Sequence, residues 1–60
     1  MKIQVKHKGK SMYIQNKPVR KAPVLTPFWD RAWDFTNLAK CKNVRDDILE
    51  YFPKNATIVA

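Results

Sequence analysis

Few side chains of this 60-residue chain belong to the types that enzymes use for catalysis. His7 is the only histidine and Cys41 the only cysteine, so the chain has no histidine and cysteine ligand set for a structural zinc ion. His7 shares one side of an alternating segment with apolar residues, which favours a partly buried packing role over that of a general base. Cys41 is expected to be either a small buried apolar residue or an incidental surface thiol.

The carboxylates have simpler explanations than acid–base catalysis. Asp30 and Asp34 are four residues apart, as catalytic pairs sometimes are, but Arg31 and the charge of a helix start explain them. The neighbouring pair Asp46 and Asp47 also suits a helix start. The chain contains no glycine-rich phosphate loop and no hydrolase or metalloprotease motif. We therefore expect no catalytic residues, no metal site and no cofactor, and a function other than that of an enzyme.

Positive charge is the strongest compositional signal, and its position is informative. The formal net charge is +7. Residues 1–21 hold seven lysines and arginines with no acidic residue, whereas residues 22–60 hold five basic and five acidic residues. Such asymmetry predicts a polyanionic partner, with nucleic acid ahead of an acidic protein surface.

The basic segment has the character of an RNA-binding hairpin. Lysine is a point charge that contacts phosphates without reading bases, and an outward tyrosine among lysines can stack on an unpaired base. No helix is rich enough in arginine to read a DNA major groove, which favours single-stranded or structured RNA. The alternative is that the lysines only protect a hairpin edge from aggregation. The predicted nucleic-acid-binding residues are Lys2, Lys6, Lys8, Lys10, Tyr13, Lys17, Arg20 and Lys21.

The N-terminal third of the chain reads as strands. Residues 2–7 alternate between apolar and polar side chains, and Gly9 can take a positive φ in the following hairpin loop. Residues 11–15 are the return strand, with Met12 and Ile14 on the inner side and Tyr13 outward. Residues 19–25 follow Pro18 and include Pro23, so they are expected to form an edge strand or an extended connector.

A first helix is predicted over residues 26–40, with Thr26 as its N-cap and Pro27 at its first position. Helical spacing places Phe28, Ala32, Phe35 and Ala39 on one core-facing line, flanked by Trp29 and Leu38. After a break at residues 41–43, Asn43 caps a second helix that Pro53 ends, and residues 57–59 form a final strand. The predicted fold is a single α+β domain over residues 1–60, with an N-terminal hairpin, with or without a third edge strand, two helices and a short C-terminal strand.

Trp33 leaves two interpretations open. The predicted helix places it away from the core line, on the flank of Lys40 and one turn from Asn37. It either fills the groove between the helices or the end of the sheet, or forms a protein-contact patch with Asn37 and Lys40, because tryptophan is enriched in binding hot spots.

Size and composition also indicate how the domain is stabilised and in which compartment it acts. A domain of this length buries a small core, so a homodimer or a bound partner is a common means of stabilisation. No apolar run approaches the ~20 residues that cross a bilayer, the N-terminus lacks the apolar block of a signal peptide, and a lone cysteine fits a reducing compartment. We expect a cytoplasmic protein with no small-molecule substrate and no membrane partner.

A basic hairpin and a compact aromatic helix in a chain of this size resemble the small early accessory proteins of lytic phages, and among them the ToxN inhibitory factors (TifA family) of T-even phages. The resemblance lies in size, charge and general character, and it assigns no residue a role. It implies an antitoxin-like, anti-defence phage protein that acts in the host cytoplasm. Such a protein inhibits a host toxin endoribonuclease together with RNA, as a homodimer. Two alternatives are a module that blocks a host enzyme without nucleic acid, and a small ribosome- or nucleoid-associated protein.

Overall fold

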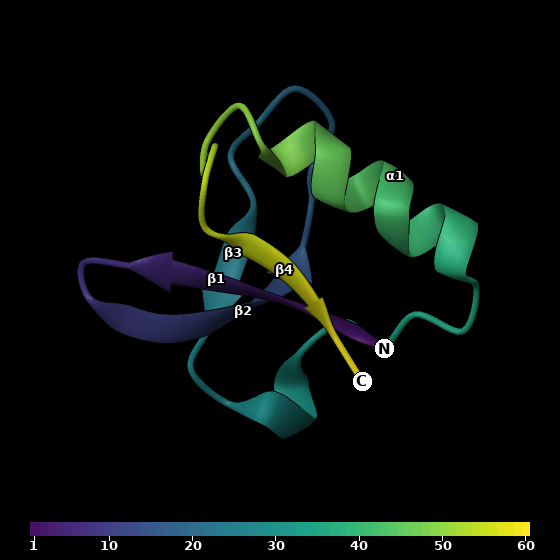
Figure 1. Ribbon diagram of the computed structural model, residues 1–60, viewed down its shortest axis with the longest axis horizontal. Helices are drawn as coiled ribbons and strands as arrows, with labels where there is room; N and C mark the ends of the chain where they lie inside the picture. Colours follow the sequence, from purple (N-terminus) through teal and green to yellow (C-terminus); the bar gives the residue numbers. More distant parts are fainter.

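The predicted N-terminal hairpin forms the centre of a four-stranded antiparallel sheet. The computed structural model describes residues 1–60, with strands β1 (Lys2–His7), β2 (Lys10–Asn16), β3 (Val24–Thr26) and β4 (Ala56–Val59) in the order β3-β2-β1-β4. One helix, α1 (Leu38–Ile48), lies on one side of the strands, and the single 3-10 turn η1 (Trp29–Arg31) lies on the other (Figure 1). The fold class is therefore α+β, as predicted, with one α-helix instead of two.

The hairpin turn follows from the one glycine. His7 pairs with Lys10 across a two-residue loop in which Lys8 (φ 54°) and Gly9 (φ 79°) both adopt left-handed backbone angles. Positive φ at both loop residues is the type I′ geometry, whose twist matches that of the two strands. The predicted loop is confirmed.

The inner face of the sheet carries the core. Ile3 and Val5 of β1 and Ile14 of β2 are fully buried, as the alternation predicted, and Met12 packs beside them. The C-terminal strand is confirmed too, since β4 pairs antiparallel with β1 and places Ile58 opposite Ile3. Residues 19–25, predicted as an edge strand or connector, are both, because only Val24 and Leu25 belong to the edge strand β3.

The predicted helix over residues 26–40 is wrong. Thr26 ends β3, η1 makes one turn, and Ala32 returns to an extended backbone (φ −67°, ψ 146°). The amide of Trp33 then donates to the carbonyl of Ile14 (2.9 Å), and that of Phe35 to the carbonyl of Met1 (2.7 Å). These two amides are therefore not available for the hydrogen bonds of a helix. Trp33 and Phe35 stack with centroids 4.3 Å apart, because side chains two residues apart share a side only in extended backbone.

The core line expected from that helix is only half correct. Ala32 and Phe35 are buried, but Ala39 is exposed and Phe28 is 56% exposed. Phe28 precedes η1, where its amide donates to the Thr26 hydroxyl (3.2 Å). The first helical turn that Thr26 was expected to cap is therefore a short turn at the end of β3, and Phe28 is no part of the core.

Helix α1 spans the break that was predicted at residues 41–43. Asn37 is its N-cap in place of Asn43, since the Asn37 side chain accepts a hydrogen bond from the Lys40 amide (3.1 Å). None of residues 41–43 is a glycine or proline, so nothing in that stretch stops a helix. Cys41 and Ile48 are fully buried, so of the two expected environments of Cys41 the structure shows the buried one. Neither α1 nor η1 is long and apolar enough to cross a membrane.

Candidate nucleic-acid interface

The seven basic side chains of residues 1–21 have no carboxylate partner within the chain. The two ion pairs of the structure join the Met1 ammonium to Asp34 (3.0 Å) and Arg45 to Asp46 (3.3 Å), and neither involves a basic side chain of this segment. The positive charge predicted from composition is therefore not neutralised by folding. Its exposed part, above all at Lys6, Lys8 and Lys10, is available to a polyanion.

Three of these lysines surround the hairpin tip, here residues 7–10. Lys6, Lys8 and Lys10 are all exposed, and the tip projects beyond the rest of the molecule at the left of Figure 1. A protruding loop with three free ammonium groups can contact several phosphates of a flexible strand. The structure thus brings this part of the predicted set together.

The outer face of the sheet, which is turned away from α1, contains no acidic residue. The side chains of directly paired residues on neighbouring strands point to the same side of a sheet. The pairs that define this face are Gln4 with Tyr13 and Thr57, Lys6 with Ser11, Lys2 with Val59, and Tyr13 with Thr26. Its members are Lys2, Gln4, Lys6, Ser11, Tyr13, Thr26, Thr57 and Val59. The face continues into the hairpin tip through Lys6, and the face and the tip together are called the basic surface below.

Trp29 covers part of the outer face, and sequence reasoning missed this. Lys2 is 9% exposed, donates from Nζ to the Trp29 carbonyl, and places Nζ 4.5 Å from the centre of the Trp29 ring. Tyr13 meets the same ring edge-on, with centroids 5.2 Å apart, and is half-buried. Trp29 itself is 43% exposed. The helix prediction placed Trp29 on a helix flank, and only recognising that this segment is not helical would have placed it here.

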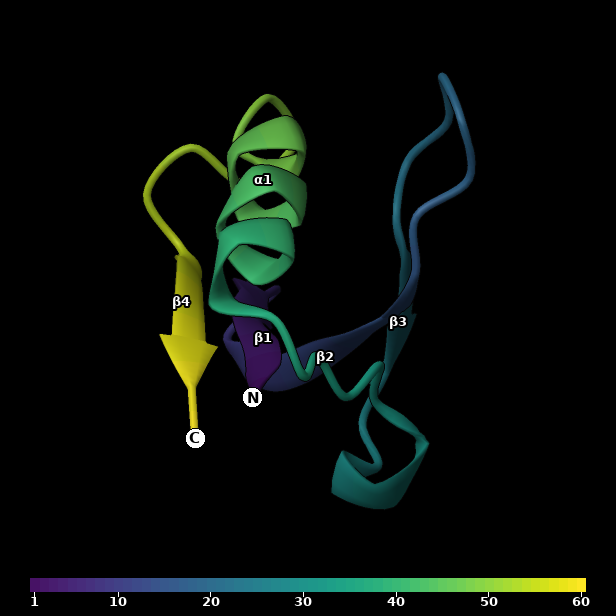
Figure 2. The same cartoon turned by 90° about the vertical axis from the view of Figure 1, so that its right-hand side faces the viewer.

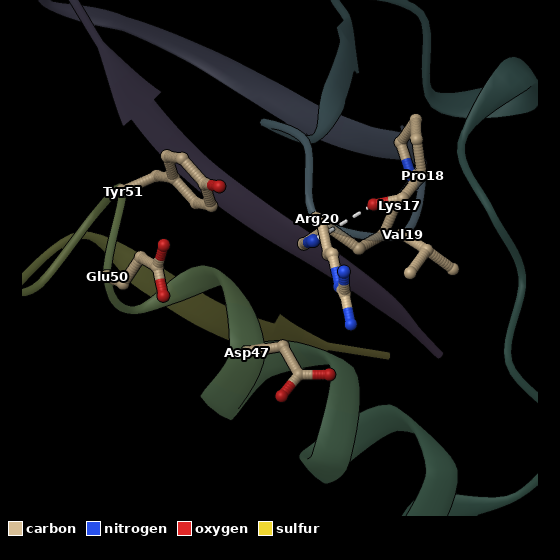
Figure 3. Close-up of a pocket in the computed structure, with 7 residues that line it drawn as sticks. All are labelled: Lys17, Pro18, Val19, Arg20, Asp47, Glu50 and Tyr51. Atoms are coloured by element: carbon tan, nitrogen blue, oxygen red, sulfur yellow. Dashed lines mark hydrogen bonds between the residues drawn. The ribbon is translucent and has the colours of Figure 1, made fainter.

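The remaining predicted residues lie elsewhere. Lys17, Arg20 and Lys21 belong to the β2–β3 connection, and two of them line a cleft of about 510 Å³ against the C-terminal end of α1. Figure 3 shows the Arg20 side chain in this cleft opposite Asp47, with Glu50 and Tyr51 on the same wall. Because two carboxylates share the cleft, it is a mixed-charge site. The predicted set therefore divides into a basic surface and a separate cleft.

Lys17 is also held by contacts near the loop, and Arg20 has an unusual backbone conformation. The Lys17 ammonium donates to the Pro18 carbonyl (3.1 Å) and lies 5.7 Å from the centre of the Tyr51 ring. Arg20 has a positive φ of 59°, an uncommon backbone conformation for a residue with a side chain. Figure 2 shows the β2–β3 connection rising beside α1, whereas η1 lies on the opposite side of the strands. The two contacts of its ammonium give Lys17 a role in shaping the connection.

The predicted protein-contact residues do come together, through contacts that differ from the expected helix face. The Lys40 ammonium lies 5.4 Å from the centre of the Trp33 ring, and Asn37 caps the helix on which Lys40 sits. Trp33 is half-buried and packs against the core through Phe35. Its first interpretation, filling space at the end of the sheet, accounts for these contacts.

The titratable side chains considered in the sequence analysis lie in different parts of the fold. His7 is exposed, not partly buried as expected, and packs edge-on against Phe52 with centroids 5.9 Å apart. Burial raises the pKa of the Cys41 thiol above its ordinary value. The hydrogen bond from the N-terminal ammonium lowers the pKa of Asp34. No group of three or more histidine, cysteine or acidic side chains lies close enough together to hold a metal ion.

Comparisons of the chain with protein-family models, curated proteins and solved structures give no match. The basic surface itself is therefore the basis for a functional proposal.

Proposed function

We propose that this protein binds single-stranded RNA with its basic surface, formed by the outer face of the sheet and the hairpin tip. The observation that carries the proposal is the unneutralised charge, since no carboxylate lies on this surface or pairs with any of its lysines. Phosphate contacts from lysines supply most non-specific affinity for nucleic acids. Lys6, Lys8 and Lys10 are the main phosphate-binding residues.

The shape of the surface favours a flexible strand over duplex DNA. Major-groove readers insert a helix or ribbon whose side chains reach base edges. The helix α1 carries Asp46 and Asp47 on exposed positions, which phosphates would repel. The outer face is a sheet surface with lysines and an exposed aromatic ring, a composition typical of single-strand binding surfaces.

Charge reversal in the hairpin tests the proposal. In Lys6→Glu with Lys10→Glu, we expect the affinity for a fluorescein-labelled octauridylate, measured by fluorescence anisotropy, to fall at least tenfold at ~50 mM salt. The slope of log affinity against log salt should become shallower by about 1.4, since each phosphate contact to a single strand contributes about 0.7.

A matched variant separates the surface from net charge. Lys42→Glu with Lys54→Glu makes the same change in charge at two exposed positions outside the basic surface. We expect this variant to keep most of the affinity and the salt slope, and both variants to unfold at the wild-type temperature. Equal losses in the two variants would show that total charge, not this surface, controls binding.

The biological role is a wider part of the same proposal. We propose that the RNA-bound protein inhibits a host toxin endoribonuclease, as the resemblance to phage accessory proteins implies, and that it does so as a homodimer. If a toxin is inhibited equally by the hairpin variant, but not by Trp33→Ala, the protein is instead a module that blocks an enzyme without nucleic acid. Light scattering on a size-exclusion column, with absorbance at 260 and 280 nm, measures the oligomeric state and any co-purifying RNA. Co-purifying ribosomal RNA would favour a ribosome-associated protein.

A further inference from the structure

Lys2 is a nearly buried cation without an ion-pair partner. The residue is 9% exposed, its ammonium donates its one hydrogen bond to the Trp29 carbonyl, and no carboxylate lies within ion-pair distance. The nearby charge of Lys2 nevertheless contributes to the lowered pKa of Asp34. Buried charges in proteins are usually paired, because removing a charge from water costs free energy. An ammonium group has three donors, so Lys2 retains donors for an anion.

Trp29 presents an exposed ring that is fixed in place. Its contacts with the Lys2 ammonium and the Tyr13 ring hold it against the outer face, yet 43% of the residue remains exposed. A rigid aromatic ring loses little conformational freedom when it stacks on a ligand, which favours binding. Phe28, 56% exposed and 5.4 Å from the Arg31 guanidinium, adds a second exposed ring next to it in the chain.

We propose that Lys2, Tyr13 and Trp29 form a subsite for one unpaired nucleotide, a step that rests on the proposed RNA binding. The Trp29 ring stacks on the base, Tyr13 supports the ring, and the Lys2 ammonium compensates an adjacent phosphate. The acid-free outer face and Lys6 next to it attract the strand, which makes a polyanion with unpaired bases the fitting occupant. Asp30, which follows Trp29 and is exposed, is the acidic residue closest in sequence to the subsite.

The consequence is a preference for unpaired over paired nucleotides. A base in a duplex is stacked between its neighbours and is not available to a protein ring, whereas every unpaired base has a free face. The lysines of the hairpin tip contact phosphates in either form. Trp29 should therefore control selectivity for single strands, and the tip lysines should control total affinity.

Tryptophan fluorescence tests this subsite directly. In a Trp33→Phe background, Trp29 is the only tryptophan of the chain. Titration with labelled octauridylate should raise the anisotropy of the RNA label. A separate titration with unlabelled octauridylate should quench the Trp29 emission, because the base stacks on the indole ring. A duplex RNA with the same number of phosphates should bind without comparable quenching.

Ring variants separate stacking from folding. Trp29→Phe keeps a ring and should bind octauridylate within about threefold of the wild-type affinity, whereas Trp29→Leu should weaken it roughly 5- to 150-fold. Both variants should bind the duplex equally well. Lys2→Met keeps the apolar stem and removes the charge, and should make the salt slope shallower by about 0.7.

The outcomes distinguish this inference from the proposed function. Binding of octauridylate with no change in Trp29 emission, or equal loss for single strand and duplex in Trp29→Leu, would overturn the subsite and leave RNA binding intact. No rise in anisotropy with either RNA would overturn the proposed function itself. Quenching by single strands only, with rescue by Trp29→Phe, would establish the subsite.

Discussion

The two sides of the sheet use the same aromatic segment in different ways. Trp33 and Phe35 stack on each other at the edge of the core, where Phe35 is 3% exposed. Trp29 lies on the outer face and Phe28 in the turn before η1, and both keep large exposed areas. Each tryptophan also has a lysine ammonium near its ring, Lys2 for Trp29 and Lys40 for Trp33.

This difference indicates which rings should contribute to the stability of the fold and which are left for binding. An aromatic ring in the core contributes its buried area to folding, whereas an exposed ring on a basic surface has that area left for a ligand. The segment 27–37 contains both buried and exposed rings because it passes from the outer face to the inner side past the start of β1. It is fixed there by the backbone hydrogen bonds of Trp33 and Phe35.

The largest expected contrast is between the two phenylalanines. Phe35→Ala should destabilise the domain by about 3–5 kcal/mol, close to the total stability of a chain this small, and leave it largely unfolded at ambient temperature. Phe28→Ala should cost less than about 1 kcal/mol, because Phe28 is 56% exposed. Thermal unfolding followed by circular dichroism measures both. Comparable losses in the two variants would show that η1 packs more tightly than its exposure indicates.

A second contrast compares the two tryptophans. Trp33→Ala should destabilise by about 2 kcal/mol, since its half-buried ring stacks on a core residue, and Trp29→Ala by about 1 kcal/mol. Urea denaturation gives both values from the transition midpoints. The effects on RNA affinity should have the opposite order. A larger loss of affinity from Trp33→Ala would transfer the binding role to the inner side.

The hairpin was predictable because its signals are local. Strict alternation over residues 2–7 and a single glycine determine strand, loop and face within a few residues. The segment 27–37 was not predictable in this way, since the carbonyls that hold it extended belong to Ile14 and Met1, distant in sequence. The lysines that we propose to bind phosphate follow from composition, whereas Trp29 reaches Lys2 and Tyr13 only through that tertiary path.

The junction between the segment and α1 gives a third, smaller effect. Asn37→Ala removes the side-chain acceptor for the Lys40 amide and should cost about 1 kcal/mol. Asn43→Ala is the matched control, since Asn43 is exposed inside α1 and alanine is the better helix former. It should be neutral or stabilise by about 0.5 kcal/mol. A larger loss of stability from Asn43→Ala than from Asn37→Ala would indicate that the helix starts at Asn43, as first expected.

The smallest expected effect is at the ion pair that joins the segment to the start of β1. The Met1 ammonium donates to Asp34 Oδ1 (3.0 Å) and to the Phe35 carbonyl (3.1 Å). The hydrogen bond and the charge of that ammonium lower the pKa of Asp34 below its ordinary value of 3.8. A lowered carboxyl pKa stabilises the fold above the unfolded-state pKa, and this contribution is lost as the pH falls through the folded-state pKa.

Asp34→Asn should therefore flatten the fall in unfolding temperature as the pH drops from about 5 to 2, with little change in RNA affinity at neutral pH. Asp30→Asn is the matched control, because Asp30 is exposed and forms no ion pair. It should leave the pH dependence of unfolding unchanged. Because Asp30 follows Trp29 in the chain, next to the proposed nucleotide subsite, its neutralisation should instead strengthen RNA binding slightly. Asp34 would then affect folding and Asp30 would affect binding, just as Trp33 is expected to affect folding on the inner side and Trp29 binding on the outer face.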